Sequence, residues 1–155
     1  NAVFLPKGVQ RPHPPIMIGG GGEKRTLRTL AMYGDVMNVS GTPEIVQRKI
    51  EVLQRHCGDV GRDPGEIEIT TFGTIVVSDN EKLIDRVAAM FGGGLGLSVE
   101  QAKEQLPIGS GEHVRSVVQR YADVGVTQMI MASQGPWKRE VYERINAEVV
   151  EPCSV

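Results

Sequence analysis

The spacing of apolar positions changes several times along the chain and predicts alternating strands and helices. Residues 16–18 form a short apolar run between Pro15 and Gly19, which indicates a buried strand. Residues 23–33 carry apolar side chains at helical spacing, and the apolar run at 35–39 indicates a second strand. The chain therefore begins with a strand, a helix and a further strand.

A longer helix is predicted after residue 42, because Thr42, Pro43 and Glu44 supply an N-cap, a first-turn proline and a first-turn acid. The alternation then continues with a strand at 67–77, a helix capped by Ser78 and interrupted by a loop at 91–96, a short helix capped by Ser98, a helix at 112–124, a strand at 126–133 and a helix at 137–150. Trp137 is expected to anchor this last helix in the core.

Alternating strands and helices imply an α/β fold with a parallel sheet and right-handed crossovers. Two architectures fit, an open doubly wound sheet or a portion of a (β/α)8 barrel. Four predicted strands cannot close such a barrel, so a half-barrel would leave its first and last strands as free edges. Periodicity alone does not choose between the two.

Composition limits the classes of protein. A chain of 155 residues is expected to form one domain, 1–155, and it starts at Asn1, as a piece of a longer protein would. The 17 basic and 19 acidic residues nearly balance, which argues against a nucleic-acid or membrane binder. The two cysteines, Cys57 and Cys153, have neither metal nor redox spacing, as expected in a reducing cytoplasm.

Four consecutive glycines, Gly19, Gly20, Gly21 and Gly22, follow the first predicted strand at its carboxyl end, where α/β proteins bind ligands. Backbone amides without a neighbouring Cβ, next to a helix N-terminus, form an anion site suited to phosphate. The named phosphate motifs do not fit, because non-glycine residues follow where a Walker loop or a dinucleotide fingerprint needs glycine. A tightly packed turn without a ligand remains the other interpretation.

Other polar residues are weaker candidates. Lys24 and Arg25 could meet a phosphate, although a solvated position is the more ordinary one for both. Ser133 and Gln134 follow the last strand and could line a site at the same edge as the glycines. The segment 91–109 could be a mobile lid or a long connection. The histidines have no cysteine or carboxylate at ligand spacing, so no metal site is predicted; they are His13, His56 and His113.

Two stretches together resemble the C-terminal half of the bacterial luciferase-like family, namely RPHPPIMIGGGGEKRTLRTLAMYGDVMN and HCGDVGRDPGEIEIT. The likeness is closest to the deazaflavin-dependent branch, whose oxidoreductases use coenzyme F-420, and LSVEQAKEQLPIGSGEHVRSVVQRYADVGV is similar to its later helices. The resemblance implies strands five to eight of a (β/α)8 barrel, at 16–18, 35–39, 67–77 and 126–132.

In that family the coenzyme phosphate lies partly against the loop after the fifth strand, which corresponds to Gly19–Gly22. Ser40 after the sixth strand is placed to add a hydroxyl, and an ordinary turn residue is the other interpretation of it. The resemblance implies hydride transfer between a small-molecule substrate and coenzyme F-420. The alternatives are an FMN-dependent monooxygenase and a non-catalytic half-barrel that self-associates. The expected partner is an N-terminal half-barrel or a second copy of the chain in a homo-oligomer. No catalytic residue is assigned, because the family's substrate-side residues come from the first four strands.

Overall fold

The computed structural model describes residues 5, 8–133 and 138–153 of the chain. Its first half contains β1 (Met17–Gly19), α1 (Thr26–Tyr33), β2 (Val36–Val39), α2 (Pro43–Val60), the short 3-10 turn η1 (Pro64–Glu66) and β3 (Glu68–Val77). Its second half contains α3 (Glu81–Gly94), α4 (Val99–Gln105), β4 (Ile108–Gly109), α5 (Gly111–Asp123), β5 (Gln128–Ser133), α6 (Arg139–Ile145), the π-helical turn η2 (Asn146–Val150) and α7 (Glu151–Cys153). The predicted alternation of strands and helices is confirmed.

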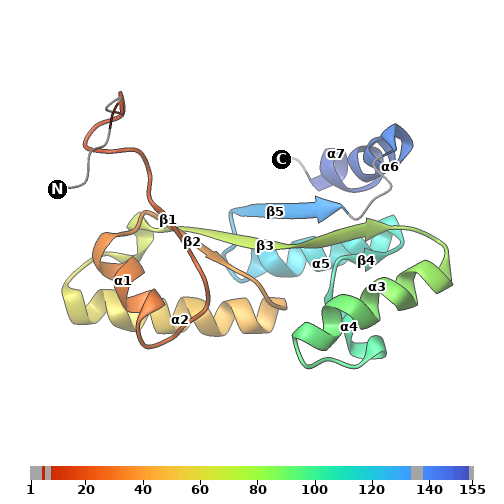
Figure 1. The fold of residues 1–155 in the computed structure, drawn as a ribbon, viewed down its shortest axis with the longest axis horizontal. Helices are drawn as coiled ribbons and strands as arrows, with labels where there is room; N and C mark the ends of the chain where they lie inside the picture. Colours follow the sequence, from red (N-terminus) through yellow and green to blue (C-terminus); the bar gives the residue numbers. More distant parts are fainter. Residues whose placement is uncertain (1–4, 6–7, 134–137, 154–155) are drawn as a thin grey trace.

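Every strand pairing in the sheet is parallel, and β3 is the strand that joins the others. β1 pairs with β2, and β2 pairs with the first residues of β3, while β5 pairs with β3 along 70–75 (Figure 1). The short β4, which the periodicity did not predict, pairs with the last two residues of β3. The chain thus has an α/β fold with a parallel sheet.

The helices α1, α2 and α5 cover one face of this sheet. The main core cluster lies between them and the strands, and it comprises Leu27, Leu30, Ala31, Met37, Val39, Val46, Val52, Leu53, Cys57, Ile67, Val117, Tyr121 and Val126. Cys57 belongs to it as a small apolar residue. Val46, Leu53 and Cys57 lie on the face of α2 that packs into this core, and Thr42 caps the helix by accepting a hydrogen bond from the Ile45 amide.

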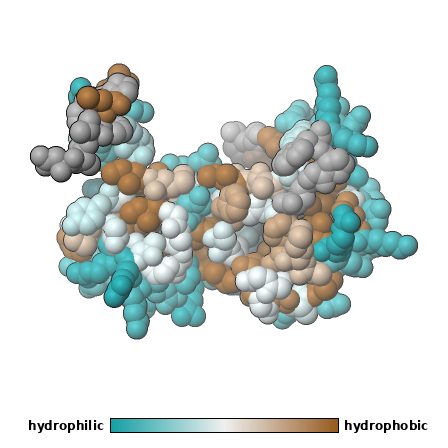
Figure 2. Space-filling model, viewed as in Figure 1, coloured by the Kyte–Doolittle hydropathy of each residue, from teal (hydrophilic) through white to brown (hydrophobic). Residues whose placement is uncertain are grey.

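The opposite face of the sheet keeps apolar side chains exposed. Met17 on β1 is 46% exposed and Phe72 on β3 is 48% exposed, although both lie in strands. Their neighbours in sequence, such as Ile18, pack against the core, because successive strand residues point to opposite faces. Figure 2 shows apolar residues in brown gathered across the middle of the molecule, between more hydrophilic flanks.

The elements α3, α4 and β4 form a second small core at the carboxyl end of β3. It comprises Ile84, Val87, Ala88, Ala102, Leu106 and Ile108. The predicted loop at 91–96 is wrong for residues 91–94, because α3 continues to Gly94, and only residues 95 and 96 form a turn. Gly92 allows the two helices to approach closely, since a Cβ on it would stand 2.6 Å from the Cβ of Ala102. The predicted N-cap is also wrong, because Asn80 rather than Ser78 accepts the capping hydrogen bond, from the Leu83 amide.

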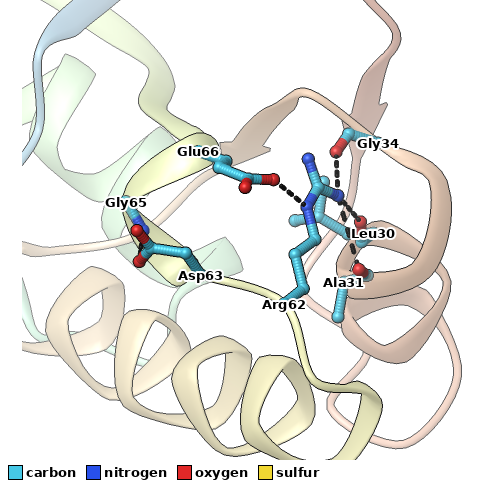
Figure 3. Close-up of polar contacts among 7 residues, drawn as sticks. All are labelled: Leu30, Ala31, Gly34, Arg62, Asp63, Gly65 and Glu66. Atoms are coloured by element: carbon cyan, nitrogen blue, oxygen red, sulfur yellow. Dashed lines mark hydrogen bonds and ion pairs between the residues drawn. The ribbon is translucent and has the colours of Figure 1, made fainter.

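A side chain from a distant part of the sequence completes the C-terminus of α1. Arg62 donates to the carbonyl oxygens of Gly34 at 2.7 Å, Ala31 at 3.3 Å and Leu30 at 3.4 Å, and it pairs with Glu66 at 3.1 Å (Figure 3). The last carbonyls of a helix have no partner within it, so a cation there satisfies them. This contact joins α1 to the end of α2.

The N-terminus of α1 differs from the prediction. The helix starts at Thr26 rather than Glu23, and residues 23–25 form a turn. Other boundaries shift by one or two residues, as helix and strand ends commonly do. The predicted cap of α4 by Ser98 is confirmed, and it forms a capping box in which Ser98 and Gln101 each bond to the backbone of the other. The candidates Gln134 and Trp137 lie outside the described residues.

Among the residues described, the structure contains no helix with the length and apolar character needed to cross a bilayer.

Candidate functional site

The glycine turn (residues 19–22) lies at the carboxyl edge of the sheet, immediately after β1. Gly19 is in register with Asn38 of β2, and the amide of Gly20 donates to the Asn38 carbonyl at 2.9 Å. Gly20 has a φ of +119°, a conformation that favours glycine. One of the predicted amides is therefore used by the sheet, whereas those of Gly21 and Gly22 donate to no backbone carbonyl among the described residues.

A lysine from α2 lies next to Gly21. A Cβ on Gly21 would stand 3.3 Å from Cε of Lys49 and 3.9 Å from its Nζ. The ammonium group pairs with Glu23 at 2.8 Å, and the Lys49 side chain is only 19% exposed. The hydrogen bond from Lys49 lowers the pKa of the Glu23 carboxyl, so this carboxylate stays charged at neutral pH. Arg48 also contacts Glu23, at 3.2 Å.

The backbone of the same segment is held by α2 as well. His56 bonds to the Glu23 carbonyl oxygen at 2.7 Å through Nε2. Lys24 and Arg25, the basic residues closest in sequence, are exposed. Sequence reasoning missed Lys49, because only the packing of α2 on α1 brings it to the turn. Glycine main chain beside a positive charge fits a phosphate, and Glu23 is the group that an incoming anion would have to replace.

Ser40 lies at the carboxyl end of β2, the strand next to the glycine turn. The structure does not place the two in one cavity. Ser40 lines a cavity of about 230 Å³, and the four glycines are not among the residues that line it. The cavity has walls from β3, α3, β4 and α5, formed by Ser40, Gly41, Phe72, Gly73, Thr74, Phe91, Gly94, Leu95, Leu106, Pro107, Ile108, Tyr121 and Met131. Of these residues, Ser40 is the one that the sequence analysis named as a cofactor-binding candidate.

This cavity, called the gap cavity below, lies beside an interruption in the sheet. The Glu68 amide donates to the Asp35 carbonyl before β2, and the Val76 amide donates to the Pro107 carbonyl before β4. Residues 68 and 76 are an even number of positions apart, so both amides leave β3 on the same side. β2 and β4 therefore flank β3 on one side, and the carbonyl of Ile69 faces β5 on the other.

Between these two short neighbours, part of β3 has no strand beside it among the residues that the structure describes. The pairing with β2 ends at Thr71, and the pairing with β4 begins at Val76. On this side the main chain from 72 to 75 therefore faces the gap cavity instead of a strand. Phe72, Gly73 and Thr74 line the cavity accordingly.

Tyr121 closes the gap cavity from α5. Its hydroxyl donates to the Gly41 carbonyl at 2.6 Å, and Gly41 has a φ of +145°. Burial raises the pKa of Tyr121 to about 12, so the hydroxyl stays protonated at neutral pH and holds the turn after β2. Tyr121 thus shapes the cavity wall and fixes the turn at Gly41.

The remaining candidates lie apart from the glycine turn. Ser133 is buried on β5 and lines a different cavity, against α6 and η2. His113 bonds to the Leu106 carbonyl at 3.1 Å, and His13 lies 3.7 Å from the Asp35 carboxylate. Asn38 was not predicted, yet its buried Oδ1 has no partner among the described residues. The segment 91–109 forms the end of α3, α4 and β4, and it supplies much of the gap-cavity wall.

Comparison with solved structures supports the fold. The chain superposes on a coenzyme F-420-dependent tetrahydromethanopterin reductase from Methanopyrus kandleri with a TM-score of 0.68 and 17% identity, covering 90% of this chain and 51% of that one. A coenzyme F-420-dependent secondary alcohol dehydrogenase in complex with a coenzyme–acetone adduct gives a TM-score of 0.71 and 16% identity, with coverage of 90% and 49%.

A third solved structure contains FMN instead of coenzyme F-420. It is the oxygenating constituent of 3,6-diketocamphane monooxygenase from Pseudomonas putida in complex with FMN, with a TM-score of 0.62, 12% identity and coverage of 92% of this chain and 50% of that one. The chain thus spans about half the length of these structures.

A search of curated protein sequences found no significant match. The sequence profile of the luciferase-like monooxygenase family, in contrast, matches residues 1–151, nearly the whole chain. The expected resemblance is confirmed: this chain belongs to the luciferase-like monooxygenase family.

Proposed function

We propose that the chain is the C-terminal half of a luciferase-like oxidoreductase and that its glycine turn binds the phosphate of a deazaflavin or flavin coenzyme. The observation that carries this proposal is the position of Lys49 beside Gly21 of the glycine turn. Backbone donors and a lysine ammonium together form a common phosphate-binding arrangement. When bound, the coenzyme ring would supply hydride transfer or, as a flavin, oxygen activation.

Coenzyme F-420 is our first choice and FMN the alternative. Both kinds of enzyme occur among the structures that share this fold. In this proposal Ser40 adds a hydroxyl on the side of the next strand, and β1, β2, β3 and β5 are the fifth to eighth strands of the barrel. The substrate would be a small molecule held against the ring.

The open face of the sheet is an argument that a partner covers it. Met17 and Phe72 are exposed there, and the outer edges of β1 and β5 pair with no other described strand. An N-terminal half-barrel would cover both the face and the edges, as would a second copy of the chain. The second arrangement, without a coenzyme, is the non-catalytic alternative.

Fluorescence titration of coenzyme F-420 and FMN tests the proposed site, with the chain alone and with the preceding half-barrel supplied in trans. Lys49→Gln removes the ammonium and should weaken the binding of either coenzyme by about tenfold. Glu23→Gln removes the competing carboxylate and should strengthen binding, whereas general damage to the turn would weaken it in both variants. Arg55→Gln, an exposed change on the same helix, is the control.

Binding of neither coenzyme, even with the half-barrel present, would overturn the proposed function. Light scattering on the same samples identifies the non-catalytic alternative, which requires a homodimer that binds neither compound.

A further inference from the structure

The gap cavity combines apolar walls with a free stretch of strand main chain. Its walls are largely apolar, and none of its lining residues carries a charge. A carbonyl and an amide on one side of β3, those of Phe72 and Thr74, face the cavity where neither β2 nor β4 reaches. Main-chain groups left without a partner in an apolar place are costly, so such a place favours a ligand that bonds to them.

The size and polarity of the gap cavity restrict what it can hold. About 230 Å³ is roughly the volume of seven or eight water molecules and lies below the usual range of drug-sized pockets. The uncharged lining disfavours an ion, because a charge without a partner there would lose its hydration. The occupant must therefore be small and neutral.

The strand edge specifies the polar part of the occupant. In a parallel ladder, the carbonyl of Phe72 and the amide of Thr74 would be matched by an N–H donor and a C=O acceptor from a neighbouring strand. A ligand that replaces this neighbour needs a donor and an acceptor on one edge. A cyclic amide has both, together with an apolar ring for the side chains of Phe91, Leu95 and Leu106.

We propose that the gap cavity binds a small neutral cyclic amide, which accepts a hydrogen bond from the Thr74 amide and donates one to the Phe72 carbonyl. The further step, that such cyclic amides are the class of substrate, rests on the proposed function. The binding itself does not depend on the glycine turn, because the four glycines do not line the cavity.

Titration of the ¹⁵N-labelled chain with ε-caprolactam tests the proposal. We expect a saturable shift of the Thr74 amide resonance and nuclear Overhauser contacts from the ring to the methyl groups of Leu106 and Ile108. Cycloheptanone has the same ring size without the N–H and should bind three- to tenfold more weakly, roughly the loss of one hydrogen bond. The ring-opened zwitterion 6-aminohexanoate should not bind.

Two adjacent glycines on α3 provide a matched pair of variants. Gly94 lines the cavity and Gly93 does not, while both are exposed and have no atom within 4 Å of a built Cβ. Gly94→Leu should abolish ε-caprolactam binding by filling the cavity, and Gly93→Leu should preserve it.

The absence of a saturable Thr74 shift in the folded chain would overturn the inference, as would equal binding of 6-aminohexanoate. Unchanged binding in Gly94→Leu would also overturn it. If that variant fails to fold, the unmodified chain provides the test, and the absence of ring contacts to Leu106 and Ile108 there would overturn the inference. Lys49→Gln separates the two proposals, because it should weaken coenzyme binding and leave ε-caprolactam binding unchanged. Coenzyme binding without lactam binding refutes the cavity proposal alone.

Discussion

At the scale of single residues, Arg62 shows that one of the two stretches resembling the family stabilises the fold. The stretch HCGDVGRDPGEIEIT contains this arginine, and its guanidinium satisfies the carbonyls at the end of α1 (Figure 3). Asp63 in the same stretch caps the turn η1 by accepting from the Gly65 amide at 2.9 Å. These residues join the end of α1 to the turn η1 between α2 and β3.

We predict that Arg62→Met lowers the free energy of unfolding by about 2 kcal/mol, because the carbonyls of α1 lose a charged donor. Urea denaturation followed by circular dichroism measures the change. Arg55→Met, an exposed substitution on α2, should change stability by less than about 0.5 kcal/mol. Equal effects of the two substitutions would contradict the role of Arg62.

Tyr121 gives a prediction on pH. Burial raises its pKa to about 12 in the folded chain, above the ordinary value of about 10 for an unfolded tyrosine. Its contribution to stability is therefore complete below pH 10 and is lost as the pH rises from 10 towards 12. Tyr121→Phe should remove this part of the pH dependence and cost about 1 kcal/mol at neutral pH. Chemical denaturation of both proteins across this range tests it, and parallel curves would refute it.

The residues at the site show what sequence reasoning reaches. The glycine turn was found because its four residues are adjacent and follow an apolar strand. Lys49 was not found, since nothing near it in sequence marks it and only the packing of two helices brings it to Gly21. The Thr74 amide could not be predicted as a binding group either. It faces the gap cavity only because the pairing with β2 ends before residue 74 and the pairing with β4 begins after it.

At the scale of elements, the periodicity identified long strands and helices but not the short or glycine-rich ones. β4 has two residues and is too short to produce a pattern. The run FGGG was predicted as a loop because glycine disfavours helix, yet α3 includes it. Packing against α4 overrides that local preference, since only glycine at position 92 fits against Ala102.

The glycines of α3 are expected to respond in opposite directions. Gly92→Ala would bring two methyl carbons to 2.6 Å, so the helices must separate, and we expect a loss of about 1–3 kcal/mol. Gly93→Ala has free space and should gain up to about 1 kcal/mol from higher helix propensity. Thermal unfolding of the two variants measures both changes, and a stable Gly92→Ala would show that α3 and α4 pack less tightly than described.

At the scale of the whole molecule, one face of the sheet is covered and the other is open. We predict that the isolated chain associates through this open face, because exposed apolar side chains and free strand edges favour contact with another surface. Met17→Lys should reduce the average mass in sedimentation equilibrium. Met90→Lys changes a methionine that is 58% exposed on α3 and should have little effect. A monomer at all concentrations would contradict the prediction.

The central position of β3 has a consequence for how the chain folds. β3 pairs with β2 before it in sequence and with β4 and β5 after it, and Thr70 finds its partner in Gln128. Loops must close over long separations before these contacts form, which slows folding. A nascent chain that has left the ribosome only through β3 exposes one side of that strand, and the sheet is completed only when β5 emerges.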